Sequence, residues 1–265
     1  MSIIKAVKKY ITLECLFIKS NFIATSKYGL SYFLSIFYEF INGIMNMIYF
    51  YFIFENVDAI GTWNKENVFL LVAIGYFIDV ICVLLFIGAA SIPEYISTGL
   101  LDVLLIKPIN HRFLLCFRRP NSVQIINVFF AIVLIVIAIP KENLDVLAIL
   151  LFLLSLSMSI VIMYLVMSTF VYLSFWTVRV GNMWGIVEQF NAISNRPKDI
   201  YPKFIKFFLT MIIPSIVMIN YPAEVIIFKN YELILTRTLP VLILFCFINK
   251  LVFKLGIKKY SGAGG

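Results

Sequence analysis

Residues 67–93 read NVFLLVAIGYFIDVICVLLFIGAASIP, and Asp79 is the only charged side chain among them. A helix needs about 20 mostly apolar residues to cross the hydrocarbon core of a bilayer, and an apolar run of this length is unusual in a water-soluble domain. The stretch therefore predicts a transmembrane helix with a single acid near its middle.

The rest of the chain has the same character. Of its 265 residues, 62% are hydrophobic and 14% are charged, against about 25% charged residues in a soluble domain. Five further runs carry no charge, at residues 40–54, 120–140, 146–178, 207–223 and 238–249. We predict an all-α, polytopic membrane protein with six transmembrane helices, in which the longer runs cross alone and the shorter ones cross together with flanking residues.

Spans one to four and span six follow directly from these runs, at residues 28–54, 67–90, 122–139, 146–173 and 233–253. Span five has two interpretations. In the first, residues 177–206, which hold five cations, stay on the cytoplasmic side and residues 207–223 cross. In the second, residues 181–195 cross as a short polar helix, and residues 203–228 dip into the outer leaflet and return as re-entrant helices.

Lysine and arginine collect on particular segments of the chain, whose net charge is +8. Residues 1–27 hold five of them, the loop at 91–121 holds four, and four more lie at 250–259, whereas the loops at 55–66 and 140–145 hold one each. Because cations accumulate on cytoplasmic loops, we predict that both termini are cytoplasmic and that the protein lies in the plasma membrane. These cations suit anionic lipid headgroups, and nucleic-acid binding is not expected.

The two ends of the chain are predicted to lie outside the bilayer core. Residues 1–27 form an amphipathic interface helix in this prediction, because apolar residues make one stripe and lysines gather beside it. Residues 28–260 are the transmembrane domain, and residues 261–265, SGAGG, are expected to be a cloning remnant. The four cysteines are isolated and His111 is the only histidine, so we expect no metal site and no enzymatic activity.

The loop at 91–121 carries several helix signals. Ser91 and Glu94 have the spacing of a capping box, which predicts that a helix begins there. Pro108 ends that helix, Asn110 caps a second one, and Pro120 stops it before span three. The sequence thus predicts two short cytoplasmic helices, and the many apolar residues of 100–106 predict that the first one docks against another surface.

This loop resembles that of a known family. Residues 94–120, EYISTGLLDVLLIKPINHRFLLCFRRP, are similar to the first cytoplasmic loop of ABC-2 type ABC transporter permeases, in a branch with the pattern Gly-x-Leu-Asp-x-x-Leu-x-Lys/Arg-Pro. Gly99, Leu101, Asp102, Lys107 and Pro108 carry this match. Residues 174–190 and 197–226 resemble the same branch, the second through Tyr201, Pro202, Pro214, Tyr221, Pro222 and Ala223.

The resemblance implies a function. Permeases of this family pair with a second permease subunit, identical or paralogous, and each docks on a cytoplasmic ABC ATPase that holds ATP and Mg²⁺. This chain has no phosphate-binding loop of its own. Residues 94–107 would be the coupling helix, and the residues expected at the contact with the ATPase are Glu94, Gly99, Leu101, Asp102, Leu105, Lys107 and Pro108.

Polar side chains inside the predicted spans mark a candidate pathway. An ionised carboxylate at the centre of a bilayer costs at least about 2.5 kcal/mol, so Asp79 should face the helix bundle or a cavity. We expect it to share the subunit interface or the substrate path with Glu39, Asn42, Glu188, Gln189 and Asn191. A path with many aromatic residues and few charges suits the export of an amphipathic or hydrophobic substrate such as a lipid, peptide or drug. An alternative is a proton-coupled carrier or a channel that uses Asp79 and Glu39.

Overall fold

The computed structural model describes residues 3–140, 145–177 and 183–260, and every regular element in these ranges is a helix, which confirms the all-α prediction. In chain order the helices are α1 (Ile3–Ser26), α2 (Leu30–Phe54), α3 (Lys65–Phe86), η1 (Ile87–Ser91), α4 (Ile92–Ser97), α5 (Leu100–Leu105), α6 (His111–Phe117), α7 (Gln124–Ala138), α8 (Val146–Tyr172), η2 (Leu173–Phe175), α9 (Met183–Ser194), η3 (Lys198–Ile200), α10 (Lys203–Met211), α11 (Ser215–Ile227), the π-helical η4 (Ile234–Thr238) and α12 (Leu239–Lys259).

Four helices in the described residues are long and apolar enough to cross a membrane. They are α2, α3 continued through η1 and α4, α8 with η2, and η4 with α12. Helices α10 and α11, which bend by 96° relative to each other, make a fifth if they are counted as one span, whereas α7 is a shorter apolar helix of 15 residues. These helices support a multi-pass membrane protein, and the count of six spans stays a prediction.

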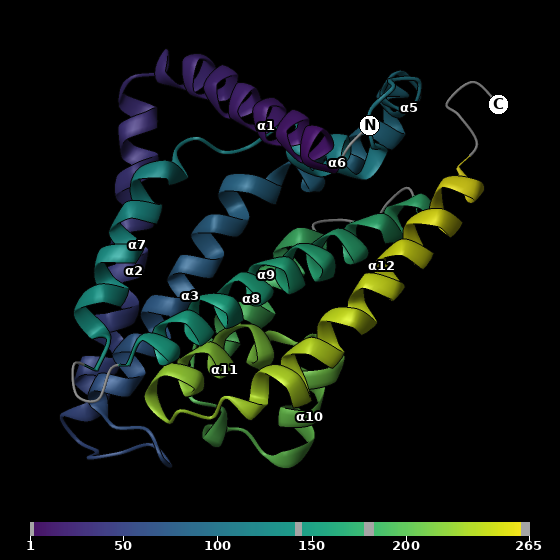
Figure 1. The fold of residues 1–265 in the computed structure, drawn as a ribbon. Helices are drawn as coiled ribbons and strands as arrows, with labels where there is room; N and C mark the ends of the chain where they lie inside the picture. Colours follow the sequence, from purple (N-terminus) through teal and green to yellow (C-terminus); the bar gives the residue numbers. More distant parts are fainter. Residues whose placement is uncertain (1–2, 141–144, 178–182, 261–265) are drawn as a thin grey trace.

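The helices form a bundle with one helix laid across its end. Figure 1 shows α1 crossing the top of the bundle, while α2 and α7 descend side by side on one flank and α12 rises on the other. Helix α3 packs against α7 and α11, and α8 packs against α11 and α12. Since most of α3 is buried between these neighbours, the predicted second span is the central helix of the molecule.

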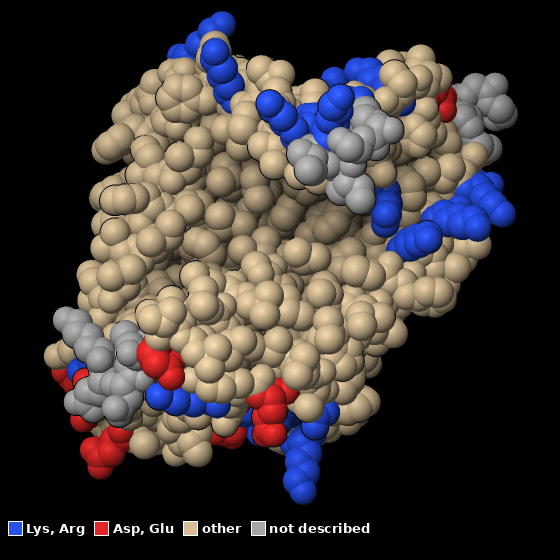
Figure 2. Space-filling view, in the orientation of Figure 1, with Lys and Arg blue, Asp and Glu red and all other residues tan. Residues whose placement is uncertain are grey.

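The charges divide the molecule into two ends. Figure 2 shows lysine and arginine gathered over α1, the 91–121 loop and the end of α12, and most visible acids at the opposite end. We call the first of these the basic end. The cations of residues 1–27, 91–121 and 250–259 therefore share one end of the structure, as the accumulation of cations on one side of a membrane protein predicts.

The chain passes from one end of the bundle to the other between residues 175 and 199. Phe175 packs on the ring of Phe253, at 6.3 Å between centroids, in the part of α12 that approaches the basic end. Asp199 instead accepts a hydrogen bond of 3.2 Å from Thr62, in the loop at the opposite end. Helix α9 lies between these points, and α10 and α11 fold back at the far end. Which of these segments crosses the membrane stays a prediction in both interpretations of span five.

The loop between α3 and α7 forms three short helices where the sequence predicted two. The expected capping box is wrong: Ser91 lies in continuous helical structure, with φ −83° and ψ −4°, and caps no amide. An N-cap residue needs extended backbone, which Ser91 does not have because it is itself the last residue of the helical η1. The predicted helix at 94–107 is also divided, since Gly99 adopts a left-handed conformation with φ 72°. The cap at Asn110 is confirmed, as its Oδ1 accepts a hydrogen bond of 3.2 Å from the amide of Phe113.

Helix α1 has one face on the bundle and one face open. The Tyr10 ring lies 4.7 Å from that of Phe113, and Asn21 Oδ1 accepts a hydrogen bond of 3.0 Å from the amide of Ser122. Val7 and Ile11, on the apolar stripe, are exposed by 52% and 59%. The stripe is therefore free to contact lipid, as the interface-helix prediction requires.

Glu14 lies on α1 with both carboxyl oxygens buried and no hydrogen-bond partner in the described part of the chain. Burial raises the pKa of Glu14 from 4.5 to about 7. The folded protein thus holds this proton more tightly than the unfolded chain, and stability falls as the pH rises from about 4.5 to about 7.

We expect Glu14→Gln to stabilise the protein at pH 8 and to leave it nearly unchanged at pH 5. Because Glu14 is only half-buried, solvent screening reduces the gain to about 1 kcal/mol, or roughly 2 °C in melting temperature. Thermal unfolding of the detergent-solubilised protein at the two pH values measures this. Glu55→Gln, at an exposed site, is the control. A gain of equal size at both pH values would show that ionisation of Glu14 is not the cause.

Candidate functional site

A cavity of about 610 Å³ lies between the helices of the bundle. Carboxyl groups come to it from three helices, Glu39 from α2, Asp79 from α3 and Glu188 from α9, and we call it the acidic cavity. Its other lining residues are Tyr38, Asn42, Asn46, Val72, Tyr76, Val80, Cys82, Val83, Gln124, Met163, Met167, Gly185, Gln189, Ala192 and Asn195.

The acidic cavity brings together five of the six pathway residues predicted from the sequence. Glu39 and Asn42 lie one helical turn apart on α2 and face it together, opposite Asp79. Glu188 and Gln189 reach it from α9. The side chain of Asn191 lies outside the described residues. The polar residues of three separate predicted spans therefore share one space, as expected for costly groups in a membrane.

Amide side chains hold two of the three acids. Asn195 lies beside Asp79, and Gln124 lies beside Glu39, close enough to favour the ionised carboxylate in each case. The negative charges also act on one another, since Asp79 is within electrostatic range of both Glu39 and Glu188. Neighbouring carboxylates without a cation repel, so the cavity as built favours positive charge.

Sequence reasoning missed five polar residues of the cavity, which are Tyr38, Asn46, Tyr76, Gln124 and Asn195. Gln124 lies in an uncharged run where the rule that polar groups face the bundle would have found it. The position of the Asn195 side chain requires a glycine at residue 75, because a Cβ atom at Gly75 would collide with Asn195 Oδ1. Such a contact between distant segments leaves no signal in the local sequence.

The predicted coupling residues lie in α4, α5 and the turns beside them, at the basic end. Leu101 is fully buried and Leu105 is partly buried, so both attach α5 to the bundle. Glu94 forms an exposed ion pair of 3.3 Å with Arg119. Gly99 provides the break before α5, as described above.

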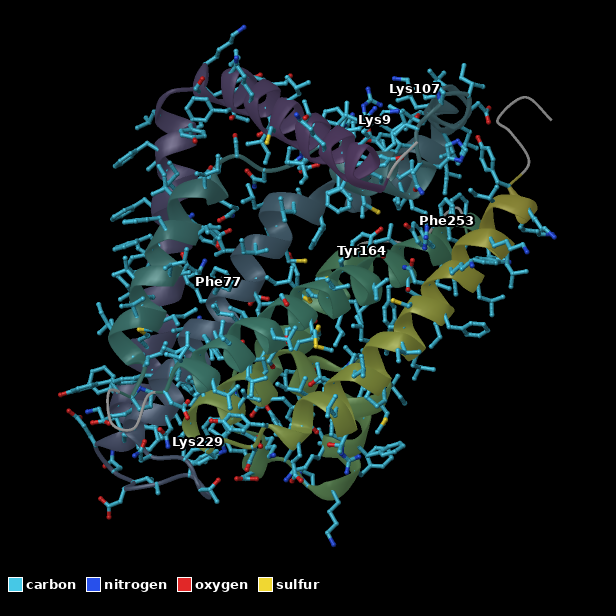
Figure 3. The ribbon with its side chains drawn as sticks, in the orientation of Figure 1. Lys9, Phe77, Lys107, Tyr164, Lys229 and Phe253 are labelled. Carbon is cyan, nitrogen blue, oxygen red and sulfur yellow. The ribbon has the colours of Figure 1, made fainter. Side chains whose placement is uncertain are left out.

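The outer face of α5 carries both charges and apolar side chains. Asp102, Lys107 and Pro108 are exposed, and no ion pair joins Asp102 to Lys107 in the structure as described. Val103 and Ile106 are exposed by 52% and 81% beside them. Figure 3 shows Lys107 projecting from the tip of the basic end, beyond Lys9. This face, which we call the α5 surface, has the mixed composition of a protein contact surface.

The loop is joined tightly to the bundle beneath it. A Cβ atom on Gly88 would lie 2.6 Å from the carbonyl oxygen of Cys116, so η1 and α6 meet backbone to backbone. Phe117 packs on the rings of Phe86 and Tyr164, with centroids 5.1 and 5.6 Å away. A force applied to the loop is therefore applied to α3 and α8 as well.

A polar junction links the same loop to α12. Asn249, which is fully buried, accepts a hydrogen bond of 3.1 Å from Arg112 of α6. Its amide group donates to Ser168 and Thr169 of α8 at 2.8 and 3.0 Å. Buried amides are stable only when their hydrogen bonds are made, so this junction holds α6, α8 and α12 in one arrangement.

A second hollow, of about 500 Å³, opens on the face shown in Figure 2, below α1 and α6. Phe113, Phe117 and Tyr164 line it, and Arg112 and Lys250 also border it. Figure 3 shows Tyr164 on the α8 side of this hollow. Its apolar floor and cationic border have the character of a surface that faces lipid headgroups.

A family model described as ABC-2 family transporter protein matches residues 40–264 of the chain. No curated protein and no solved structure gives a significant match. The matched residues include the loop, its junctions with α8 and α12, and the acidic cavity except for Tyr38 and Glu39, which lie just before the matched region.

Proposed function

Because the chain belongs to the ABC-2 family of transporter proteins, we propose that it is the permease subunit of an ATP-binding cassette exporter. In this proposal a partner ATPase binds the ATP and Mg²⁺, and the permease has no catalytic site of its own. The substrate crosses the plasma membrane through the bundle and is amphipathic or hydrophobic, a lipid, a peptide or a drug.

The α5 surface carries the proposal of ATPase docking. Exposed apolar side chains next to an acid and a lysine that do not pair with each other fit a protein partner with complementary charges. The junctions at Gly88 and Asn249 support transmission of movement, since they connect the loop to α3, α8 and α12.

Orientation and subunit pairing belong to the same proposal. With the basic end in the cytoplasm, both termini and the α5 surface face the ATPase, in line with the accumulation of cations on cytoplasmic loops. A second permease, identical or paralogous, completes the pore. Many side chains of α2, such as Phe33, Tyr38 and Phe52, are exposed by more than half, which leaves a large apolar face for lipid or for that subunit.

The acidic cavity favours one second candidate function, a proton-coupled carrier or a channel that uses Asp79 and Glu39. Intramembrane carboxyl groups serve such proton pathways in other membrane proteins. Transport by the purified chain without any ATPase, driven by a pH gradient alone, would favour this candidate over the exporter.

We expect an ABC ATPase to co-purify with the tagged chain. Asp102→Lys should reduce the amount of co-purified ATPase by about tenfold or more, since like charges across an interface cost several kcal/mol. Quantitative immunoblotting of the ATPase after affinity purification, and its ATP turnover in the complex, give the two readouts.

The matched control for this experiment is Asp58→Lys, which makes the same charge reversal at an exposed position in the loop at the opposite end. It should leave the amount of ATPase unchanged. Full recovery and normal turnover with Asp102→Lys would place ATPase docking elsewhere than on the α5 surface.

A further inference from the structure

The described residues that line the acidic cavity carry negative charge and no positive charge. None of its lining residues is Lys, Arg or His in the described part of the chain, while Glu39, Asp79 and Glu188 all face it. The ion pairs among the described residues are formed by acids outside the cavity, which are Glu94, Asp145, Asp199 and Glu224. Carboxylates inside a membrane are normally paired with a cation, and for Asp79 and Glu39 the described residues supply none. A cationic ligand would supply that charge.

Tyr76 gives a second, independent indication of a ligand. Its side chain is only 9% exposed, and its hydroxyl has no hydrogen-bond partner among the described residues. The ring lies in the wall of the acidic cavity and packs against α2, 3.0 Å from where Gly43 would carry a Cβ. A buried hydroxyl without a partner costs about 1–3 kcal/mol, which a bound molecule would recover.

The remaining lining residues indicate the kind of cation. No three His, Cys, Asp or Glu side chains of the described residues lie close enough together to hold a metal ion. The acids instead surround a volume of about 610 Å³, within the range of about 300–1,000 Å³ that pockets for organic molecules occupy. Tyr38 and Tyr76 provide aromatic faces, and Met163 and Met167 provide polarisable sulfur atoms. Aromatic faces attract organic cations with a low charge density.

We propose that the acidic cavity binds a drug-sized lipophilic organic cation, and that this is the charge class of the exported substrate. The assignment rests on the proposed function, because it names the cargo of that exporter. Asp79 and Glu39 neutralise the positive charge from two sides, the tyrosine rings contact its apolar groups, and the amides of Asn42 and Gln124 accept hydrogen bonds from any N–H group it carries.

Tetraphenylphosphonium and tetraphenylborate test this proposal, because the two ions are nearly equal in size and shape and opposite in charge. After subtraction of each ion's binding to empty nanodiscs, we expect the purified permease in nanodiscs to bind tetraphenylphosphonium measurably by isothermal titration calorimetry and to bind tetraphenylborate at least tenfold more weakly. Equal or tighter binding of the anion would overturn the proposal.

Charge-removing variants locate the binding. Asp79→Asn and Glu39→Gln, which keep the side-chain shape, should each weaken tetraphenylphosphonium binding about tenfold, and Asp58→Asn in the distant loop should not. Unchanged affinity in both cavity variants would contradict the proposal. If one variant elutes as an aggregate in size-exclusion chromatography, the other variant, together with the comparison of the two ions on the natural protein, still tests the proposal.

The experiment separates this inference from the proposed function. If an ATPase co-purifies but the cation does not bind, or only protons bind, the cation assignment is wrong. The exporter proposal is not affected by that result. If the protein binds the cation but no ATPase co-purifies with it, the exporter proposal is wrong and the cation site stands. In the complex, tetraphenylphosphonium should also raise ATP turnover, and Asp79→Asn should abolish that rise.

Discussion

Replacing Gly88 by alanine is expected to separate the loop from the bundle. The added Cβ atom would lie 2.6 Å from the carbonyl oxygen of Cys116 and 3.1 Å from the amide nitrogen of Arg119. Both neighbours are backbone atoms, so no side-chain rotation relieves the clash and α6 must move away. We expect a loss of about 1–3 kcal/mol in stability and a loss of ATPase recovery, measured by thermal unfolding in detergent and by co-purification.

The matched control is Gly43→Ala, which adds the same methyl group against the ring of Tyr76 at 3.0 Å. A side chain can shift by a few tenths of an ångström, and alanine favours the helix over glycine by about 1 kcal/mol, so this variant should be nearly neutral in stability. A melting temperature for Gly88→Ala within one degree of the natural protein would show that the contact between η1 and α6 is looser than described.

The second large effect is expected from Lys198→Met. Lys198 Nζ lies 2.6 Å from Glu224 Oε1, and the Glu224 side chain is only 4% exposed. The variant leaves that carboxylate buried without its cation, and breaking a buried ion pair in this way costs about 3–5 kcal/mol. The loss should appear as a lower melting temperature, together with protease sensitivity around η3 and α10.

Two further variants identify the cause of this loss. Lys206→Met breaks the ion pair with Asp199, at 3.4 Å and with both side chains more exposed, so its cost should stay below about 1 kcal/mol. Adding Glu224→Gln to Lys198→Met removes the orphaned charge and should restore much of the stability. If the double variant is as unstable as Lys198→Met alone, the charge of Glu224 is not what makes the lysine necessary.

Hydropathy was sufficient to predict most of the long helices. The predicted spans at 28–54 and 146–173 share one end each with Leu30–Phe54 and Val146–Tyr172 and differ by two residues and one residue at the other end. The bilayer imposes one requirement on such segments, a long apolar run, and the sequence records that run directly. The pathway residues around Asp79 could be grouped for the same reason, because polar groups in lipid must face inward.

The details that failed depend on backbone conformation and on long-range contacts. Ser91 has the residue type of a cap, but the helical η1 before it leaves no free amide for it to bind. Gly99 ends α4 through a positive φ angle. A glycine permits this conformation, but its presence in the sequence does not show that the conformation is adopted. Asn195 reaches Asp79 only because α9 packs beside α3, and the course of that segment was one of two interpretations.

The buried amide of Asn249 has a mechanical consequence. It fastens α6, α8 and α12 at a single point, so any stroke delivered through the loop moves α8 and α12 together and cannot pry them apart. Helix α2, with few buried residues, is held far less firmly. In the proposed exporter, α8 and α12 would therefore shift as one rigid body when the loop moves, and the helix free to shift relative to them would be α2, which bears Glu39.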